Sequence, residues 1–566
     1  MFLFQKVKNK WSYMTVLIAA VFILCIIYRY VDIYLPLAYE GGDELGVFYI
    51  IKTIRDHGWY LYNPDVGGVT GGLMYDYIYS DSLSFVLVKI ISCFIKDIYA
   101  IGNIFYFLSY ILTSLTSFYV FGKLGYGKDV SLVMSLLFAF SPYMQMRYGH
   151  LWLTSYYMLP LVCMVSVWIS NGTFSDDNIP FYKKIIFWQA MAISFFAAFT
   201  GFYYAFFTCI VYALALFIRI LNSNNVKEIK KELYVFFFFL CVILGILINI
   251  LPNLFYWMVH GFNEYSEMAR RGIGDAEYYG LKLIQLILPR SNHRIGFMRE
   301  LAEVYSTNYP LVNENSTSSL GIIATIGFIA SLVGVFYRKN KAWIYSYINI
   351  GLLIIATIGG IGTVFSFIVH TPMRCYNRLS LFIMFFSLLC VADFLKKIKC
   401  RYSPKYVYGV LCLILLVGIY DQTVTAMPNQ NSDLDSTRSF VKQIEGIMET
   451  DARIFQLPYI DWPSGGSYRL FAGYLESDKL RWSFGSMQGR EEAIWQQCVS
   501  DFTTNTVDKF IENIVYGGYD GIYLDRVLFE QLYGKDMTNN ICDELAYQLD
   551  FDPIVSENNE LYFWNM

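Results

Sequence analysis

Apolar runs long enough to cross a lipid bilayer recur along this chain and constrain its fold more than any other feature. A membrane-spanning helix needs about 20 mainly apolar residues, and about eleven segments approach that length. Hydrophobic residues make up 56% of the 566 residues and charged residues only 16%, whereas soluble domains average about 25% charged residues. We therefore predict a polytopic α-helical membrane protein. The expected spans are residues 12–30, 98–121, 130–146, 152–170, 185–200, 202–220, 232–257, 318–337, 342–363, 377–395 and 404–422.

The basic residues of the short connections fall on one side of the predicted membrane. If the N-terminus is cytoplasmic, every dense Lys/Arg cluster lies on the inner side, which is the pattern that sets membrane orientation. The densest cluster joins the last two spans and contains Lys396, Lys397, Lys399, Arg401 and Lys405. We therefore expect a multi-pass protein of the cell membrane with a cytoplasmic N-terminus and, after an odd number of spans, an extracytoplasmic tail.

Under this topology the outer side gains two long polar loops, residues 31–97 and 258–317, and the tail. We divide the chain into a transmembrane module, residues 1–422, and an outer domain, residues 423–566. In the tail, "ARIFQLPYI" and "DGIYLDRVLF" are β-rich, whereas "DKFIENIVYGGY" has the pattern of a helix ended by glycine. The tail is therefore predicted to be a small α/β domain packed on the membrane part.

Composition excludes some classes of partner. The net charge of −3 argues against nucleic-acid binding. The eleven cysteines show no C-x-x-C pairing and mostly lie in apolar segments, so we interpret them as small core residues. Aromatic residues reach 19%, which suits both membrane-interface belts and platforms for sugar rings.

The first outer loop brings carboxylates to the membrane edge. Its stretch "YEGGDELGVFYIIKTIRDHGWYLYNP", residues 39–64, predicts a short amphipathic helix after Asp43 that ends at Gly58. A second such helix is predicted over residues 82–96, capped by Ser80 or Asp81. Both helices are expected to lie in the headgroup plane. Asp43 and Asp81 could each be only a helix N-cap, and that alternative stays open.

This arrangement resembles the GT-C fold of integral-membrane glycosyltransferases, which take a sugar from a polyprenyl-phosphate carrier. The shared features are an acid soon after the first span, two amphipathic helices in a long first outer loop, a second large outer loop and a C-terminal outer domain. Within this class the chain is most similar to bacterial YfhO-like and related polysaccharide-modifying members. The resemblance implies inverting transfer from an undecaprenyl-phosphate type of donor to a cell-surface glycan, with Asp43 as the catalytic base. The implied partners are the lipid-linked donor, the glycan acceptor and membrane lipid.

Cationic side chains at the outer ends of spans are candidates for binding the donor phosphate. "SPYMQMRYGHLW" places Arg147 and His150 three residues apart, and "HTPMRCYNRLS" places Arg374 and Arg378 one turn apart. A guanidinium fork matches the geometry of a phosphate. The alternative is that these arginines only reach lipid headgroups or pair with acids.

The second outer loop supplies further candidates beside the membrane. Its segment 277–288 is apolar and amphipathic, and is expected to lie at the interface. Glu277 begins this segment and is expected to position a sugar hydroxyl. His293 and Arg294 follow it and are expected to contact phosphate, although caps and headgroup contacts explain all three residues equally well.

Three more acids of the first loop, Glu44, Asp76 and Asp81, are expected to position the substrate. Asp43 with Glu44 could supply oxygen ligands to Mg or Mn, but nothing in the sequence completes a coordination shell. No other cofactor is expected.

Other functions fit the same composition. A flippase or transporter of lipid-linked sugars would favour broken spans, internal repeats and charges at the midplane, whereas the charges here lie at the outer edge. A polysaccharide polymerase or ligase would use a similar lipid-linked donor. The sequence distinguishes this function poorly from transfer of a sugar by a glycosyltransferase. A non-catalytic scaffold would keep its activity when these charges are removed.

Overall fold

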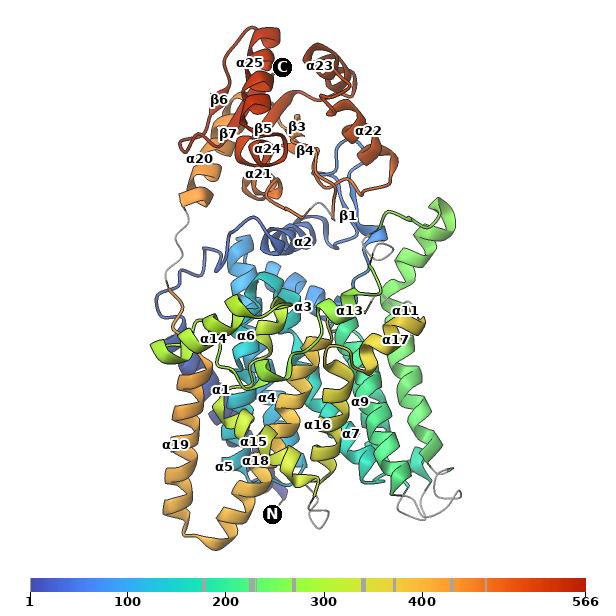
Figure 1. Cartoon of the computed structure of the whole chain (residues 1–566), viewed down its shortest axis with the longest axis vertical. Helices are drawn as coiled ribbons and strands as arrows, with labels where there is room; N and C mark the ends of the chain where they lie inside the picture. Colours follow the sequence, from blue (N-terminus) through green and yellow to red (C-terminus); the bar gives the residue numbers. More distant parts are fainter. Residues whose placement is uncertain are drawn as a thin grey trace.

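The computed structural model has a helical part with a small sheet domain at one end (Figure 1). It describes residues 2–175, 180–222, 230, 232–266, 271–336, 343–369, 373–427, 432–463 and 466–566. Helix α1 begins at the end of the molecule opposite the C-terminal sheet (Figure 1). The long helices of the helical part are α1 (Phe2–Ile27), α4 (Ile98–Lys123), α5 (Lys128–Ala139), α7 (Leu159–Ser170), α8 (Ile185–Ala197), α9 (Phe202–Leu221), α11 (Val235–His260), α15 (Ile322–Gly334), α16 (Trp343–Ala356), α18 (Ser380–Arg401) and α19 (Pro404–Gln422).

The polytopic helical class predicted from hydropathy is confirmed, whereas the number of spans is not. Six helical segments of the described residues are long and apolar enough to cross a membrane, and five apolar helices are shorter. The eleven-span count therefore stays a prediction. Residues 337 and 342, each at the edge of an expected span, lie outside the described residues. The six longer segments are Ile98–Lys123, Tyr148–Ser170, Phe202–Leu221, Glu232–His260, Tyr376–Arg401 and Pro404–Gln422.

Several expected spans are interrupted at one end of the bundle. The span expected over 130–146 divides into α5 and a short helix α6 (Pro142–Met146), because Ser141 caps a new helix start by accepting a hydrogen bond from the Met144 N–H. The span expected over 152–170 begins with the 3₁₀ turns η2 (Tyr148–Thr154) and η3 (Tyr156–Met158). The span expected over 342–363 ends at Ala356 and continues after a turn as α17 (Ile361–Val369).

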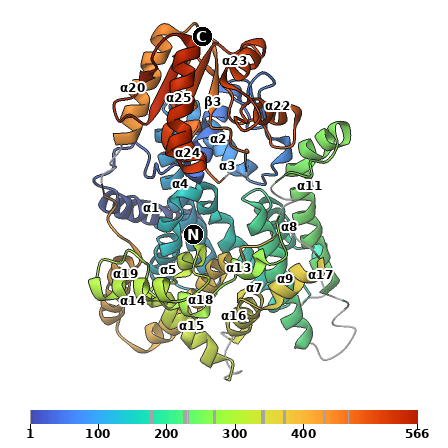
Figure 2. The same cartoon turned by 45° about the horizontal axis from the view of Figure 1, so that its top comes forward.

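The first outer loop forms the two helices expected there, but the first is buried. Helix α2 (Asp43–His57) ends at Gly58, whose φ of +89° suits glycine, and α3 (Ser82–Ser92) stops four residues early. Residues 44–54 of α2 are buried, and the helix lies between the bundle and the C-terminal domain (Figures 1 and 2). The expectation that α2 lies in the headgroup plane is therefore wrong, because the sheet domain covers its outer face. The small elements β1 (Tyr62–Asn63), β2 (Gly72–Leu73) and η1 (Met74–Asp76) join the two helices.

The second outer loop differs from its prediction in where the amphipathic helix lies. The segment expected over 277–288 contains only the end of α13 (Asp275–Tyr278) and the 3₁₀ turn η6 (Leu283–Leu286). The amphipathic helix is α14 (Gly296–Asn308), which exposes Phe297, Leu301 and Val304. The loop ends with the 3₁₀ turn η7 (Glu314–Ser318), and a further turn, η8 (Tyr376–Leu379), precedes α18.

The C-terminal domain contains a five-stranded mixed sheet. Strand order is β4-β3-β5-β7-β6, with β4, β3 and β5 parallel, and β7 antiparallel to both β5 and β6. The strands are β3 (Arg453–Leu457), β4 (Arg481–Trp482), β5 (Gly521–Asp525), β6 (Ile554–Val555) and β7 (Leu561–Asn565). The helices are α20 (Ser432–Ile447), α21 (Phe471–Glu476), α22 (Glu491–Val499), α23 (Val507–Tyr516), α24 (Arg526–Tyr533) and α25 (Lys535–Leu549).

The period-two pattern of the strands builds two separate cores. Phe455 and Ile522 point to one face, where they pack in a cluster with residues of α23 and α25. Ile454 and Tyr523, their neighbours in sequence, point to the other face and belong to the large core that continues into the helical part. The sheet domain is therefore packed on the membrane part through one face of its sheet.

A buried lysine joins α2 to this domain. The Lys52 ammonium donates hydrogen bonds to the carbonyl oxygens of Tyr474, at 2.6 Å, and of Leu475 and Ser477. These carbonyls lie at the C-terminal end of α21, where a helix lacks its own donors and favours a positive charge. The sequence showed Lys52 only as a charge on an amphipathic helix.

We expect Lys52→Met to lower the free energy of unfolding by about 1.5–3 kcal/mol, because it leaves buried carbonyl groups without a donor. The measurement is thermal unfolding of the purified protein in detergent. Lys442→Met, at an exposed position on α20, is the matched control and should change little. Equal destabilisation by both variants would contradict the role of Lys52.

Candidate functional site

A cavity of about 470 Å³ opens where the two outer loops, the outer ends of the helices and the C-terminal domain meet. Its wall takes residues from α2, η2, the start of α9 and η8, and Trp462 and Tyr468 from the sheet domain. Cavities of this size commonly hold small-molecule ligands. The charged or titratable lining residues, excluding tyrosine and cysteine, are Asp43, Asp76, Asp81, His150, Arg271, Glu314, Arg374 and Arg378.

Asp43 and His150 form a pair at the cavity wall. Oδ2 of Asp43 lies 2.7 Å from Nε2 of His150, and the two side chains are 49% and 43% exposed. Burial alone raises the pKa of Asp43, but the hydrogen bond and charge of His150, together with the charge of Arg378, outweigh it, so this pKa is lowered. Asp43 is the first residue of α2 and not its N-cap, which is Gly42. It is therefore ionised at neutral pH and accessible from the cavity.

Glu314 is held between two arginines. Its Oε2 accepts hydrogen bonds from Arg147 Nη1 at 2.9 Å and from Arg378 Nη2 at 3.0 Å. Arg147 is 2% exposed and donates further to the hydroxyl of Thr317 at 2.8 Å, while Glu314 is 15% exposed. Burial raises the pKa of Glu314, but the charges of Arg378 and Arg147 outweigh it and hold the pKa well below its usual range. No motif or spacing in the sequence singles out Glu314.

Three guanidinium groups line the cavity. Arg378 lies over the ring of Tyr203 at 4.3 Å, and Arg374 lies over the ring of Tyr279 at 5.0 Å and 3.7 Å from Asp275. The 3.7 Å separation marks a loose ion pair. Arg271, from the second outer loop, was missed by the sequence analysis although "ARRG" placed two arginines there. Arg147, by contrast, is not part of the cavity wall and acts through Glu314.

Asp81 is the most deeply buried carboxylate of the cavity wall after Asp76. It is 8% exposed, and within the described residues its carboxylate has no cationic partner. Asp81 occupies the N-cap position of α3, but its side chain makes no capping hydrogen bond. Burial raises the pKa of Asp81 to about 7, against a smaller opposing effect from the backbone of Ser80. A buried acid left without a helix-capping bond is a candidate for binding a sugar hydroxyl.

Asp76 also touches the cavity, but its carboxylate is fully engaged. Arg490 of the sheet domain donates to it from Nε and Nη2 at 2.7 and 2.8 Å. Trp257 and Asn263 donate to the same carboxylate. Arg490 also donates to the carbonyl oxygens of residues 260 and 261. Asp76 therefore joins the two outer loops to the C-terminal domain at the edge of the cavity.

Besides Arg147, the structure leaves four of the expected site residues away from the cavity wall. Glu44 turns back on its own loop, where Oε1 accepts hydrogen bonds from the backbone N–H groups of residues 40 and 42. Glu277 is exposed on α13. His293 is buried 3.3 Å from Asp421, and Arg294 donates to the carbonyl oxygen of Thr423. Both of these basic residues hold the end of α19 instead.

The separation of Glu44 from Asp43 also bears on metal binding. Among the described residues, no group of three or more His, Cys, Asp or Glu side chains could hold a metal ion. The oxygen pair considered from the sequence, Asp43 with Glu44, does not converge on one point, because Glu44 bonds its own loop.

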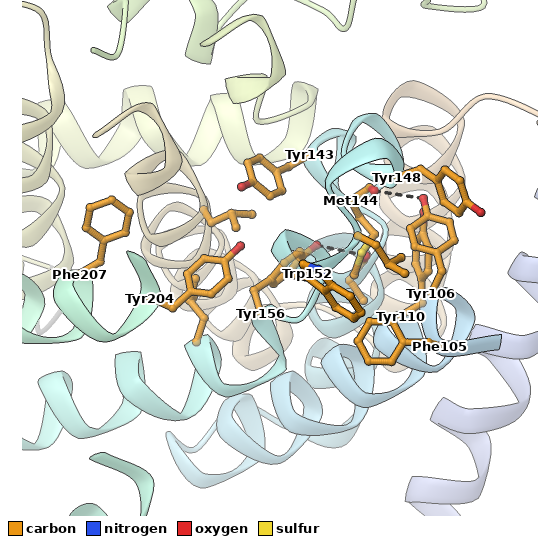
Figure 3. Close-up of a cluster of buried hydrophobic side chains, with 14 of the residues drawn as sticks. Phe105, Tyr106, Tyr110, Tyr143, Met144, Tyr148, Trp152, Tyr156, Tyr204 and Phe207 are labelled. Atoms are coloured by element: carbon orange, nitrogen blue, oxygen red, sulfur yellow. Dashed lines mark hydrogen bonds between the residues drawn. The ribbon is translucent and has the colours of Figure 1, made fainter. Parts of the chain in front are cut away.

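Aromatic side chains form a buried cluster (Figure 3), and some of them also belong to the cavity wall. Trp152 and Tyr204 belong to the cavity wall, and Trp152 packs edge-on against Phe105 of α4 at 5.7 Å between ring centroids. Deeper in the same cluster, the hydroxyl of Tyr106 donates to the carbonyl oxygen of Met144 at 3.1 Å. This packing keeps the short, broken helices of the region in fixed positions.

A family model described as a domain of unknown function, DUF6311, matches residues 73–422. The chain belongs to the DUF6311 family. The matched segment covers the bundle from β2 to the end of α19 and contains all of the charged cavity residues except Asp43. A comparison with curated proteins finds no match.

Solved structures similar to this DUF6311 protein are glycosyltransferases by name, the class that the sequence resembles. The oligosaccharyltransferase of Archaeoglobus fulgidus in its apo form is 12% identical with a TM-score of 0.45, over 93% of this chain and 70% of that chain. The oligosaccharyltransferase AglB of the same organism, in complex with an inhibitory peptide and a dolichol-phosphate, is 12% identical with a TM-score of 0.46. The match covers 99% of this chain and 74% of that chain. The arabinofuranosyltransferase AftD from Mycobacteria is 13% identical with a TM-score of 0.41. The match covers 86% of this chain and 36% of that chain. At TM-scores this low, the likeness carries no argument about this chain's reaction.

We expect Glu314→Gln to destabilise the fold by about 3–5 kcal/mol, because it leaves two buried guanidinium groups without their negative partner. Since the pKa of Glu314 is depressed in the folded state, its contribution is present above the unfolded-state pKa of about 4.3 and is lost as the pH falls below that value. Thermal unfolding of the purified protein at a series of pH values measures both effects. Glu303→Gln, exposed on α14, is the control, and an equal response from it would refute the role of Glu314.

We expect Asp81→Asn to stabilise the protein at pH 8 by an amount on the order of 2–4 kcal/mol, because ionised Asp81 is unfavourable when buried. The pKa of this carboxyl is raised to about 7 in the folded state, so the cost of ionisation is full above pH 7 and vanishes below about pH 4. The unfolding temperatures of the variant and the wild type should therefore converge at pH 4. If Asp81→Asn raises the unfolding temperature equally at pH 8 and pH 4, ionisation of Asp81 does not destabilise the fold, and the prediction is wrong.

Proposed function

We propose that this protein is a membrane glycosyltransferase that moves a sugar from a polyprenyl-phosphate donor to a glycan acceptor. One observation carries the proposal: an accessible carboxylate–imidazole pair, Asp43 and His150, shares a cavity with the guanidinium groups of Arg271, Arg374 and Arg378. Direct displacement at an anomeric carbon needs both kinds of group. A base accepts the proton of the attacking hydroxyl, and cations stabilise the departing phosphate.

The position of the cavity suits a donor held by lipid. The cavity wall uses the ends of membrane helices, including residues at the start of α9 and in the turn η8 that precedes α18. A polyprenyl chain keeps its phosphate at the level of the headgroups, so a site at the helix ends reaches the sugar–phosphate bond without extracting the lipid. Arg374 is a phosphate candidate because its guanidinium group belongs to the cavity wall.

The sides of the membrane follow from the distribution of basic residues. We propose that the cavity opens on the extracytoplasmic side, with the N-terminus in the cytoplasm. Residues 1–422 then form the catalytic membrane module and residues 423–566 the outer domain. Trp462 and Tyr468 of the outer domain belong to the cavity wall, so this domain is proposed to shape the space for the acceptor.

We expect Asp43→Asn to lower sugar transfer by about 10²- to 10⁴-fold, because an amide cannot accept or support the transfer of the proton. Transfer is measured from radiolabelled polyprenyl-phosphate sugars to membrane glycan, with the binding of unreactive donor measured separately. Glu40→Gln, an exposed acid on the same loop, is the matched control and should transfer as the wild type does. If neither the wild type nor Asp43→Asn transfers sugar, and both move the lipid-linked sugar across a bilayer, the protein is a flippase and the proposal is wrong.

A further inference from the structure

His150 projects into the cavity from a break in a helical segment. Its backbone angles, φ −113° and ψ 60°, interrupt the 3₁₀ turn η2. One ring nitrogen, Nε2, lies 2.7 Å from Asp43 Oδ2, and no hydrogen bond is recorded for Nδ1 within the described part of the chain. The ring is therefore held at one nitrogen and is open at the other.

The partner of Nε2 fixes which nitrogen carries the proton. An ionised carboxylate only accepts hydrogen bonds, so Nε2 must donate its N–H to Asp43. In the neutral ring Nδ1 then has a lone pair and can accept a proton. A carboxylate that holds one imidazole nitrogen in this way also stabilises the imidazolium that forms when the other nitrogen is protonated.

The charges around Asp43 and His150 favour an ionised Asp43 that holds the imidazole ring. Asp43 is influenced by Arg378 and by Glu314, which face it from η8 and η7. Arg271, Arg374, Asp76 and Asp81 complete the charged wall of the cavity. Arg378 and His150 favour the ionised form of Asp43, which makes its carboxylate a weak proton acceptor but a good hydrogen-bond partner.

We infer that His150 is the catalytic base and that Asp43 is the residue that positions it. This inference rests on the proposed glycosyl transfer and names the atom, Nδ1, that receives the proton. As the acceptor oxygen forms its bond to the anomeric carbon, its proton passes to Nδ1. The bond from the anomeric carbon to the phosphate oxygen breaks, and its electron pair leaves with the polyprenyl phosphate. His150 is half-exposed and returns the proton to water.

The pH dependence of transfer by the wild-type protein separates the two candidate bases. With His150 as the base, kcat/KM falls with decreasing pH while Asp43 is still ionised. With Asp43 as the direct base, transfer continues to a pH below the ordinary pKa of an aspartate, since the pKa of this carboxyl is lowered. The donor phosphate is a diester and keeps its single charge over this range. An acid limb that appears only where the carboxyl itself is protonated would overturn the inference but leave the glycosyltransferase proposal intact.

Two variants test the roles separately. His150→Gln should lower kcat by about 10²- to 10⁴-fold with donor binding unchanged. Asp43→Glu should restore part of the transfer lost in Asp43→Asn, because a carboxylate at this position can again accept the hydrogen bond from Nε2. Wild-type transfer by His150→Gln would overturn the inference.

The chain offers a matched control for these variants. His57 and Asp65 form another histidine–aspartate pair, with 2.8 Å between Nε2 and Oδ2, outside the cavity wall. His57→Gln should transfer sugar as the wild type does, and each variant is checked for an unchanged unfolding temperature. If the wild type transfers sugar from no donor at any pH, the proposed function fails and this inference fails with it.

Discussion

The ion triad of Arg147, Glu314 and Arg378 is the interaction on which the geometry of the cavity depends. It joins three segments that are far apart in sequence: the junction of α6 and η2, the end of the second outer loop, and the turn before α18. Charges buried at this depth persist only when each is paired and hydrogen-bonded. The triad therefore fixes where Arg378 points, and through Arg378 it influences the ionisation of Asp43.

A second ion pair, between Asp76 and Arg490, holds the C-terminal domain against the cavity. The ion pair connects the first outer loop to the sheet domain, and Arg490 also reaches the carbonyl oxygens at the end of α11. Together with Lys52 beneath α21, it fixes the domain over the bundle. The cavity consequently has a wall from the sheet domain, including Trp462 and Tyr468, and a change in this domain would alter the shape of the cavity.

Local patterns predicted local structure well. The helix that starts at Asp43 and ends at Gly58 and the helix before Gly517 were both predictable, because each depends on a few neighbouring residues. The burial of α2 was not, because the cover comes from residues more than 400 positions away. Sequence spacing likewise could not show that Arg147 and Arg378 share Glu314, since no periodicity links the three.

The interrupted helices explain why the charged groups gather at one end of the bundle. Arg147, His150 and Arg378 all lie in 3₁₀ turns or at the ends of short helices rather than in long ones. A helix that stops short leaves its neighbours without a partner over the last turns, and the space is lined by whichever side chains the broken segments present. Aromatic rings such as Trp152 and charged groups such as His150 both belong to the wall of that space. Under the proposed function, this is where the lipid-borne phosphate and the acceptor would meet.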